Sequence, residues 1–195
     1  MTRIATVDQA TKETRVRVVL NLDGTGRRKV KTGIGYFDHM LEQLAFHGLL
    51  DLELTCEGDL HVDSHHTVED VGLAVGKAID QALGDRSGIR RYGHAYIPMD
   101  ETLARVVLDF SGRPEFHFQG RFSHDRIGEL ETQMLPHFFK SVALMSRMTL
   151  HMAVLYGEND HHKAEALFKG LGRAMSDSFL IEARRSGISS TKGKL

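Results

Sequence analysis

A pair of adjacent histidines followed three residues later by a glutamate occurs twice in the chain. The first copy spans residues 65–69 (HHTVE), the second spans residues 161–165 (HHKAE), and a further histidine, His39 or His137, precedes each copy. Imidazole and carboxylate groups are ligands for divalent transition metals such as manganese, iron, cobalt, nickel and zinc. One match could arise by chance, but two matched constellations predict two metal sites.

Helical spacing restricts which of these side chains can bind the same ion. Residues i, i+3 and i+4 of a helix share one face, so Glu69 can converge with His65 or with His66, and the second copy has the same choice. Adjacent histidines diverge by about 100° around a helix, which suits two different ions better than one. Positions left for water or substrate would make such sites catalytic. Eight candidate ligands divide evenly into two sets of three histidines and one carboxylate: His39, His65, His66, Glu69, His137, His161, His162 and Glu165.

The first half of the chain has the pattern of strands, helix, strand and helix. Alternating apolar residues over 15–21 and the turn residues 23–26 predict a hairpin with a strand over 29–31. Apolar spacing then predicts two helices separated by a short strand, over residues 36–47, 52–56 and 64–83. The double histidine lies in the first turn of the second helix.

The second half repeats this plan. Strands are predicted over 103–110 and 115–119, then a helix over 133–145, a strand over 149–156 and a helix capped by Asn159 and Asp160. We therefore predict an α+β fold with an internal duplication of a strand-helix-strand-helix unit. Residues 1–90 and 91–195 would be half-repeats of one catalytic domain, each a small mixed or antiparallel sheet with two helices packed on one face.

Composition argues against several classes of function. The 25 Lys and Arg residues nearly balance the 26 Asp and Glu residues, so no general field favours nucleic acid or an anionic membrane. No apolar run approaches the length of a membrane span and the N-terminal residues lack the apolar core of a signal peptide, so we expect a cytoplasmic protein. Cys56 is the only cysteine, which excludes an internal disulfide and a thiolate metal cluster; we expect it to be a buried, inert thiol.

Several segments form an ordered set around these histidines: 33–41 (GIGYFDHML), 61–70 (HVDSHHTVED), 98–101 (PMDE), 111–114 (SGRP) and 159–169 (NDHHKAEALFK). With the ending SSTKG at 189–193, they closely resemble the imidazoleglycerol-phosphate dehydratase family of histidine biosynthesis, from about Arg3 to the C-terminus. Ser64 and Ser189 stand where the family often has aspartate and proline, and neither is an expected ligand.

The resemblance implies a hydro-lyase that converts D-erythro-imidazole-glycerol phosphate to imidazole-acetol phosphate, through an imidazolate held between two Mn²⁺ ions per active site. It implies a large homo-oligomer built from trimers, with sites at subunit contacts and ligands shared between halves or subunits. On this basis one ion is assigned to His39, His65, Glu69 and His162. The other ion is assigned to His66, His137, His161 and Glu165.

The resemblance also implies roles for residues that pattern alone would leave unremarked. Glu13 is the expected general acid or base and a substrate contact, with His47 as a second candidate for proton transfer. Gln43 would touch the substrate, although surface exposure explains it nearly as well. The expected phosphate-binding residues are Arg91, Arg113, Ser190 and Lys192. The C-terminal tail, which composition alone reads as disordered, would then close over the phosphate; Arg91 could instead be half of a solvated pair with Arg90.

Three other readings compete with this one. The histidines could be surface residues at helix N-termini, where polar side chains are common. A dinuclear hydrolase would use similar ligands, but such enzymes usually bridge their ions with a carboxylate. A ferritin-like storage protein would place Glu-x-x-His on a helical bundle, whereas this chain has His-x-x-Glu and many predicted strands.

Overall fold

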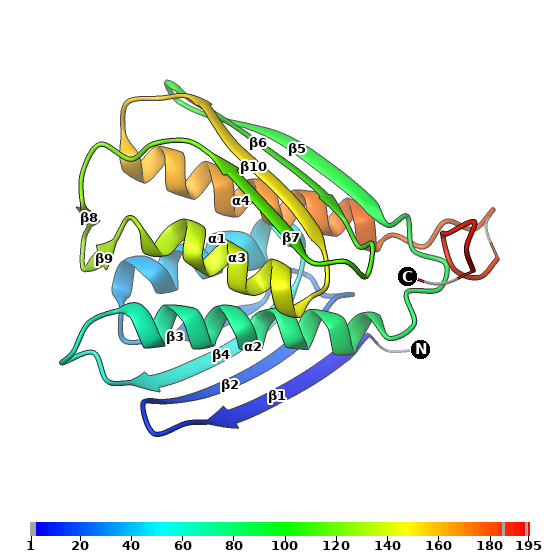
Figure 1. Cartoon of the computed structure of the whole chain (residues 1–195), viewed down its shortest axis with the longest axis horizontal. Helices are drawn as coiled ribbons and strands as arrows, with labels where there is room; N and C mark the ends of the chain where they lie inside the picture. The colour runs from blue at the N-terminus through cyan, green and yellow to red at the C-terminus, as the bar shows by residue number, and fades with distance from the viewer. Residues whose placement is uncertain (1–2, 185, 194) are drawn as a thin grey trace.

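Two four-stranded sheets enclose a layer of four helices (Figure 1). The computed structural model describes residues 3–184, 186–193 and 195. Each sheet has its two helices on its inner face, so the helices of the two halves meet in the middle of the molecule. The predicted α+β class and the internal duplication are confirmed. Among the described residues, no helix combines the length and apolar character needed to cross a bilayer.

The two halves have the same topology. In the first half the sheet order is β1-β2-β4-β3, and in the second it is β5-β6-β10-β7. The last pair in each order, β3 with β4 and β7 with β10, is parallel, whereas the other pairs are antiparallel. The elements of the first half are β1 (Ile4–Ala10), β2 (Thr14–Asn21), β3 (Arg28–Lys31), α1 (Gly35–Gly48), β4 (Asp51–Gly58) and α2 (His65–Leu83). Those of the second are β5 (Tyr92–Met99), β6 (Thr102–Asp109), β7 (Glu115–Gln119), β8 (Arg126–Ile127), β9 (Leu130–Glu131), α3 (Met134–Met145), β10 (Thr149–Tyr156) and α4 (Asp160–Phe179).

The predicted hairpin between the strands now labelled β2 and β3 is wrong. β4 lies between them and pairs with both. The turn residues instead form a loop that is held at the start of β4, because the Asp51 carboxylate accepts hydrogen bonds from the backbone N–H groups of Thr25 (2.8 Å) and Arg27 (3.0 Å). The sequence pattern also missed β1 and β5, the edge strands that form hairpins with β2 and β6.

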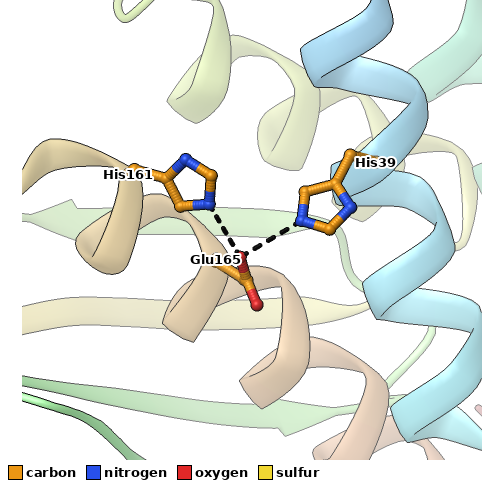
Figure 2. Close-up of side chains that lie close together, drawn as sticks. All are labelled: His39, His161 and Glu165. Atoms are coloured by element: carbon orange, nitrogen blue, oxygen red, sulfur yellow. Dashed lines mark hydrogen bonds and ion pairs between the residues drawn. The ribbon is translucent and has the colours of Figure 1, made fainter.

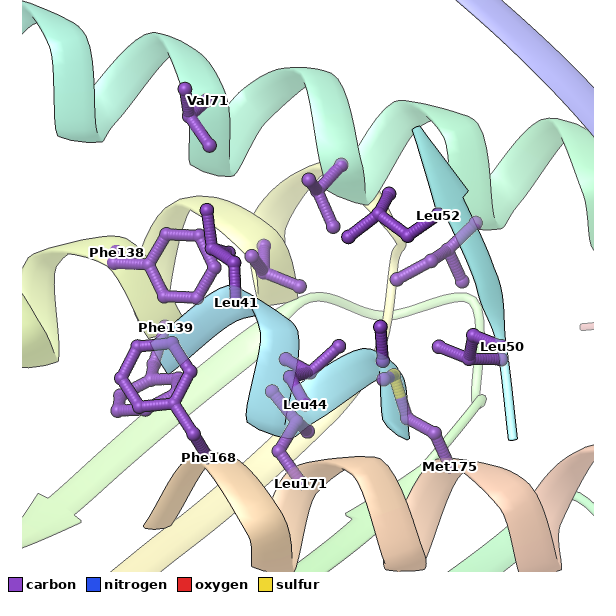
Figure 3. Packing of buried hydrophobic residues seen from close by; sticks show 14 of the residues in the cluster. Leu41, Leu44, Leu50, Leu52, Val71, Phe138, Phe139, Phe168, Leu171 and Met175 are labelled. Carbon is purple, nitrogen blue, oxygen red and sulfur yellow. The ribbon is translucent and has the colours of Figure 1, made fainter. Parts of the chain in front are cut away.

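The buried faces of both sheets and all four helices form one hydrophobic core. Leu41 and Leu44 of α1 lie among Phe138 of α3 and Phe168 of α4 (Figure 3). The rings of Phe138 and Phe168 stack with centroids 5.3 Å apart, a separation typical of stabilising aromatic pairs. Both rings belong to helices of the second half, whereas α1 belongs to the first half, so the two halves share one core. Cys56 is buried as predicted, and burial raises the pKa of its thiol to about 12.

Small residues allow the helices to approach closely across the two halves. Helix α1 packs against α4, and α2 packs against α3. A Cβ atom on Gly172 of α4 would lie 2.4 Å from the Leu44 carbonyl oxygen of α1, and one on Gly76 of α2 would lie 2.6 Å from the Val142 carbonyl oxygen of α3. Side chains larger than hydrogen would push these pairs apart. This packing places the beginnings of the paired helices next to each other.

Candidate metal centre

The beginnings of all four helices lie at one end of the molecule, and they carry the predicted ligands (Figure 1). His65 and His66 open α2, and His161 and His162 stand in the first turn of α4. The fold therefore brings candidate ligands from both halves to one end of the molecule.

His39, His161 and Glu165 form a first cluster (Figure 2). Glu165 Oε2 lies 2.9 Å from His161 Nε2 and 3.3 Å from His39 Nε2. The other carboxylate oxygen, Oε1, is 2.7 Å from Lys169 Nζ. Burial alone would raise the Glu165 pKa, but Lys169 and the two histidines outweigh burial and lower it. Two imidazole nitrogens and a carboxylate oxygen are thus turned toward one another, as a shared cation requires.

His65, Glu69 and His137 form a second cluster of the same composition. Glu69 Oε1 lies 3.1 Å from His137 Nε2, and Glu69 Oε2 lies 3.9 Å from His65 Nε2. The rings of His65 and His137 have centroids 4.8 Å apart. In both clusters the donor atoms lie within 4.8 Å of one another, and these are the two groups of this kind within the described residues.

The clusters group the predicted ligands differently from the two sets that the sequence suggested. His39 was expected beside His65 and Glu69, but it lies with the second-half residues His161 and Glu165. His137 is exchanged in the same way and joins the first-half pair. The reason is the packing of α1 against α4 and of α3 against α2. Each cluster therefore draws ligands from both halves of one chain.

The second histidine of each pair belongs to neither cluster. His66 Nδ1 lies 3.0 Å from Asp59 Oδ2, and His162 Nδ1 lies 2.7 Å from Glu101 Oε2. The hydrogen bond with Asp59 raises the pKa of His66. The sequence reasoning did not single out either carboxylate, although Glu101 belongs to the PMDE segment. His66 and His162 thus remain available for a ligand role outside these two clusters.

The expected acid and base candidates differ in their surroundings. Glu13 lies in the β1–β2 turn with a side chain that is 54% exposed, and its Oε2 is 3.7 Å from His66 Nε2. His47 is in the last turn of α1, where burial and the positive charges of Lys169 and Arg173 lower its pKa. This favours the neutral ring, which can accept a proton. Gln43, also on α1, is partly buried.

The expected phosphate-binding residues lie far from the two clusters. The C-terminal tail and the start of β5, just after Arg91, are at the end of the molecule opposite to the helix N-termini (Figure 1). Arg91 is not a solvated residue: it bonds the Asp109 carboxylate at 2.6 and 2.9 Å and the Ser189 carbonyl oxygen at 2.7 Å. A groove runs between Arg91 and the tail residues Ser190 and Thr191.

The remaining phosphate candidates extend this region. Arg113 occupies the turn between β6 and β7, and Lys192 is exposed on the tail. The tail pairs with the segment after α2 through a bridge between Ser87 and Ile188. Lys194, within the predicted tail segment, lies outside the described residues. One chain therefore does not bring the candidate phosphate-binding residues to the two histidine clusters.

A buried ion pair holds the connection between β7 and α3 against the start of α4. Asp160 Oδ1 lies 2.8 Å from Lys163 Nζ, with side chains 4% and 5% exposed. The same carboxylate accepts hydrogen bonds from the backbone N–H groups of Ser123 and His124, both at 2.8 Å. Burial by itself would raise the Asp160 pKa, but Lys163 and these donors lower it to about 2.

Replacing Asp160 with Asn is expected to lower the free energy of unfolding by about 3 kcal/mol, because the Lys163 ammonium remains buried without its partner. Urea denaturation at pH 7 measures this loss. The folded-state pKa lies below the ordinary value of 3.8, so the stabilisation is complete above about pH 4 and disappears as the pH falls toward 2. The control is Asp160→Asn with Lys163→Met, which should recover part of the loss; equal stability of wild type and the single variant would contradict the argument.

Comparison with known proteins shows which family this chain is similar to. Residues 32–175 match the family model described as imidazoleglycerol-phosphate dehydratase. Similar curated proteins carry the same name. One from Paracidovorax citrulli is 53% identical over 194 residues, covering 99% of this chain and 93% of that protein. Another from Zymomonas mobilis is 53% identical over 196 residues and covers both chains completely.

Solved structures give the same comparison at the level of the fold. The crystal structure of imidazoleglycerol-phosphate dehydratase from Staphylococcus aureus superimposes with a TM-score of 0.81 at 34% identity, covering 92% of this chain and 99% of that one. The enzyme from Pyrococcus furiosus, solved in complex with the compound (S)-C348, gives a TM-score of 0.83 at 33% identity over 97% and 100% of the two chains.

Proposed function

The chain belongs to the imidazoleglycerol-phosphate dehydratase family, and on that premise we propose that its two histidine clusters hold two Mn²⁺ ions that the dehydration requires. The family membership makes the chain a hydro-lyase of histidine biosynthesis. The metal requirement is the step that we add. The observation that carries it is the pair of matched clusters, each with two imidazole nitrogens and one carboxylate within 4.8 Å.

The donor set fits Mn²⁺. Imidazole suits several first-row transition metals, and carboxylate is a favoured ligand of Mn²⁺. Each cluster supplies three ligands from the protein, which leaves coordination positions for another histidine and for substrate. Bound ions would supply Lewis acidity to the two ring nitrogens of the substrate imidazole.

The fourth protein ligands follow from the divergence of the paired histidines. His65 is in the second cluster, so its neighbour His66 should serve the other ion, with the first cluster. By the same argument, His162 should serve the second cluster because His161 belongs to the first. Neither pairing occurs within one chain. We therefore propose that His66 and His162 reach the clusters of adjacent copies in a large homo-oligomer built from trimers.

This arrangement also accounts for the position of the phosphate candidates. Phosphate calls for cationic and hydroxyl donors, which Arg91, Arg113, Ser190 and Lys192 provide at the opposite end of the chain. A neighbouring copy would bring its tail to the metal clusters. Glu13, beside His66 Nε2, would then face the substrate and move a proton at its side chain, while the neutral ring of His47 is the second candidate for this role.

Removal and return of the metal tests the proposal directly. Metal-stripped protein should fail to convert imidazoleglycerol phosphate to imidazole-acetol phosphate, and added Mn²⁺ should restore turnover. His65→Ala and His161→Ala should not recover under the same conditions. Full activity in protein shown to contain no metal would overturn the proposal. Release of inorganic phosphate instead of the acetol product would favour the hydrolase alternative.

A further inference from the structure

Two carboxylates outside the clusters each contact one ring nitrogen of an unclustered histidine. Asp59 Oδ2 lies 3.0 Å from His66 Nδ1, and Glu101 Oε2 lies 2.7 Å from His162 Nδ1. A neutral imidazole carries a proton on only one nitrogen. A carboxylate accepts that proton's hydrogen bond, so it favours the Nδ1–H form and leaves the lone pair on Nε2. Nε2 is then the nitrogen that can bind a metal.

The two carboxylates are themselves held in place. Glu101 Oε1 accepts hydrogen bonds from the backbone N–H groups of Glu158 (3.1 Å) and Asn159 (2.8 Å), just before α4. These bonds fix the β5–β6 turn against the helix that carries His162. Asp59 lies in the loop after β4 and is 17% exposed in its side chain. Its Oδ1 is buried with no hydrogen-bond partner among the described residues, so the structure directs its side chain to His66.

The internal duplication shows that the same turn position has diverged between the halves. Glu13 directly precedes Thr14 at the start of β2, and Glu101 directly precedes Thr102 at the start of β6. Glu101 contacts Nδ1 of its histidine, whereas Glu13 approaches the opposite nitrogen, Nε2 of His66, at 3.7 Å. In the first half Asp59 takes the Nδ1 contact. Glu13 is thereby left on the side of the ring where the metal and substrate would be.

We propose that Asp59 and Glu101 are positioning residues that hold Nδ1 of His66 and His162, so that Nε2 completes the metal site of an adjacent copy. The proposal rests on the proposed function, because it assigns partners to ligands of the same two ions. It separates two kinds of carboxylate near His66. Asp59 sets the orientation and tautomer of the ligand, and Glu13 is free for proton transfer.

Manganese titrations of the full oligomer, followed by the electron paramagnetic resonance of free Mn²⁺, test the assignment. Asp59→Ala should weaken binding of one of the two ions by about 10- to 100-fold. The matched control is Glu13→Gln, which should keep both affinities while lowering kcat. Asp59→Ala with His66→Ala should bind no more weakly than His66→Ala alone, because Asp59 acts through His66. Unchanged affinity in Asp59→Ala, or further weakening in the double variant, would overturn the proposal.

Glu101→Ala gives a second test on the other ion. It also removes an acceptor from the turn before α4, so its thermal midpoint must be measured beside its affinity. Asp59→Ala is the decisive variant, because among the described residues the Asp59 side chain has His66 as its one hydrogen-bond partner. If wild type and Asp59→Ala both bind two ions with equal affinities, the positioning role is rejected and the proposed function still stands. No Mn²⁺ binding by wild type would reject the proposed function as well.

Discussion

Glu165→Gln is expected to remove one of the two proposed Mn²⁺ ions from each chain and to lower kcat/KM about a thousandfold, or about 4 kcal/mol of transition-state stabilisation. The carboxylate links His39 and His161 and is the anionic member of the first cluster. Replacement by an amide removes its charge and leaves Lys169, now 2.7 Å from Oε1, beside the site without a counter-ion. Metal content after gel filtration and steady-state kinetics measure the two effects. The control is Glu53→Gln on the exposed face of β4.

Double variants distinguish the grouping in the structure from the one that the sequence suggested. If His39 and Glu165 bind the same ion, then replacing both should still leave one ion per chain. Replacing Glu165 and Glu69 together should remove both ions, because they belong to different clusters. If the double variant of His39 and Glu165 loses both ions, then His39 binds the same ion as Glu69. That outcome would contradict the exchange of ligands between halves.

Local features were predictable where the determining contacts are close in sequence. Asn159 was predicted to cap the last helix, and its side chain accepts hydrogen bonds from the N–H groups of His161 and His162. The second helix was predicted to end at residue 83, and α2 does end at Leu83, with Gly84 at its C-cap. Strand pairing was harder, because the partners of β3 and β7 are chosen by the crossover through a helix rather than by the preceding turn. β1, with the small residues Ala5 and Ala10, gave too weak an apolar pattern to detect.

The ligand types were also predictable, whereas their grouping was not. Nothing in the spacing of His39 and Glu165 shows that α1 packs against α4, since that depends on close contacts such as Gly172 with Leu44. Asp59 and Glu101 escaped notice for a related reason. Each lies in a loop or turn outside the helix that carries its histidine, so no periodic pattern connects the two. Their role depends on a distance that only the folded chain reveals.

Mixed oligomers are expected to recover activity from two inactive variants. One variant, Glu165→Gln, has a defective first cluster and an intact tail. The other, Ser190→Ala with Lys192→Ala, has intact clusters and a tail that lacks its proposed phosphate donors. The clusters and the tail lie at opposite ends of one chain (Figure 1), so one copy should supply the tail to the clusters of another. Random assembly at equal amounts would then make about a quarter of the sites intact, given repeated contacts between identical copies.

Co-expression with two different tags and purification through both would yield these mixed oligomers, and activity per chain is the readout. The controls are each variant co-expressed with itself, which should remain inactive. A site contained in one chain predicts no recovery, since every chain carries one of the two defects. It would also require the tail to cross the length of the helix layer, away from Ser87, with which Ile188 forms a bridge. Recovery of about a quarter of wild-type activity would therefore support both the assembly and an active site that is shared between copies.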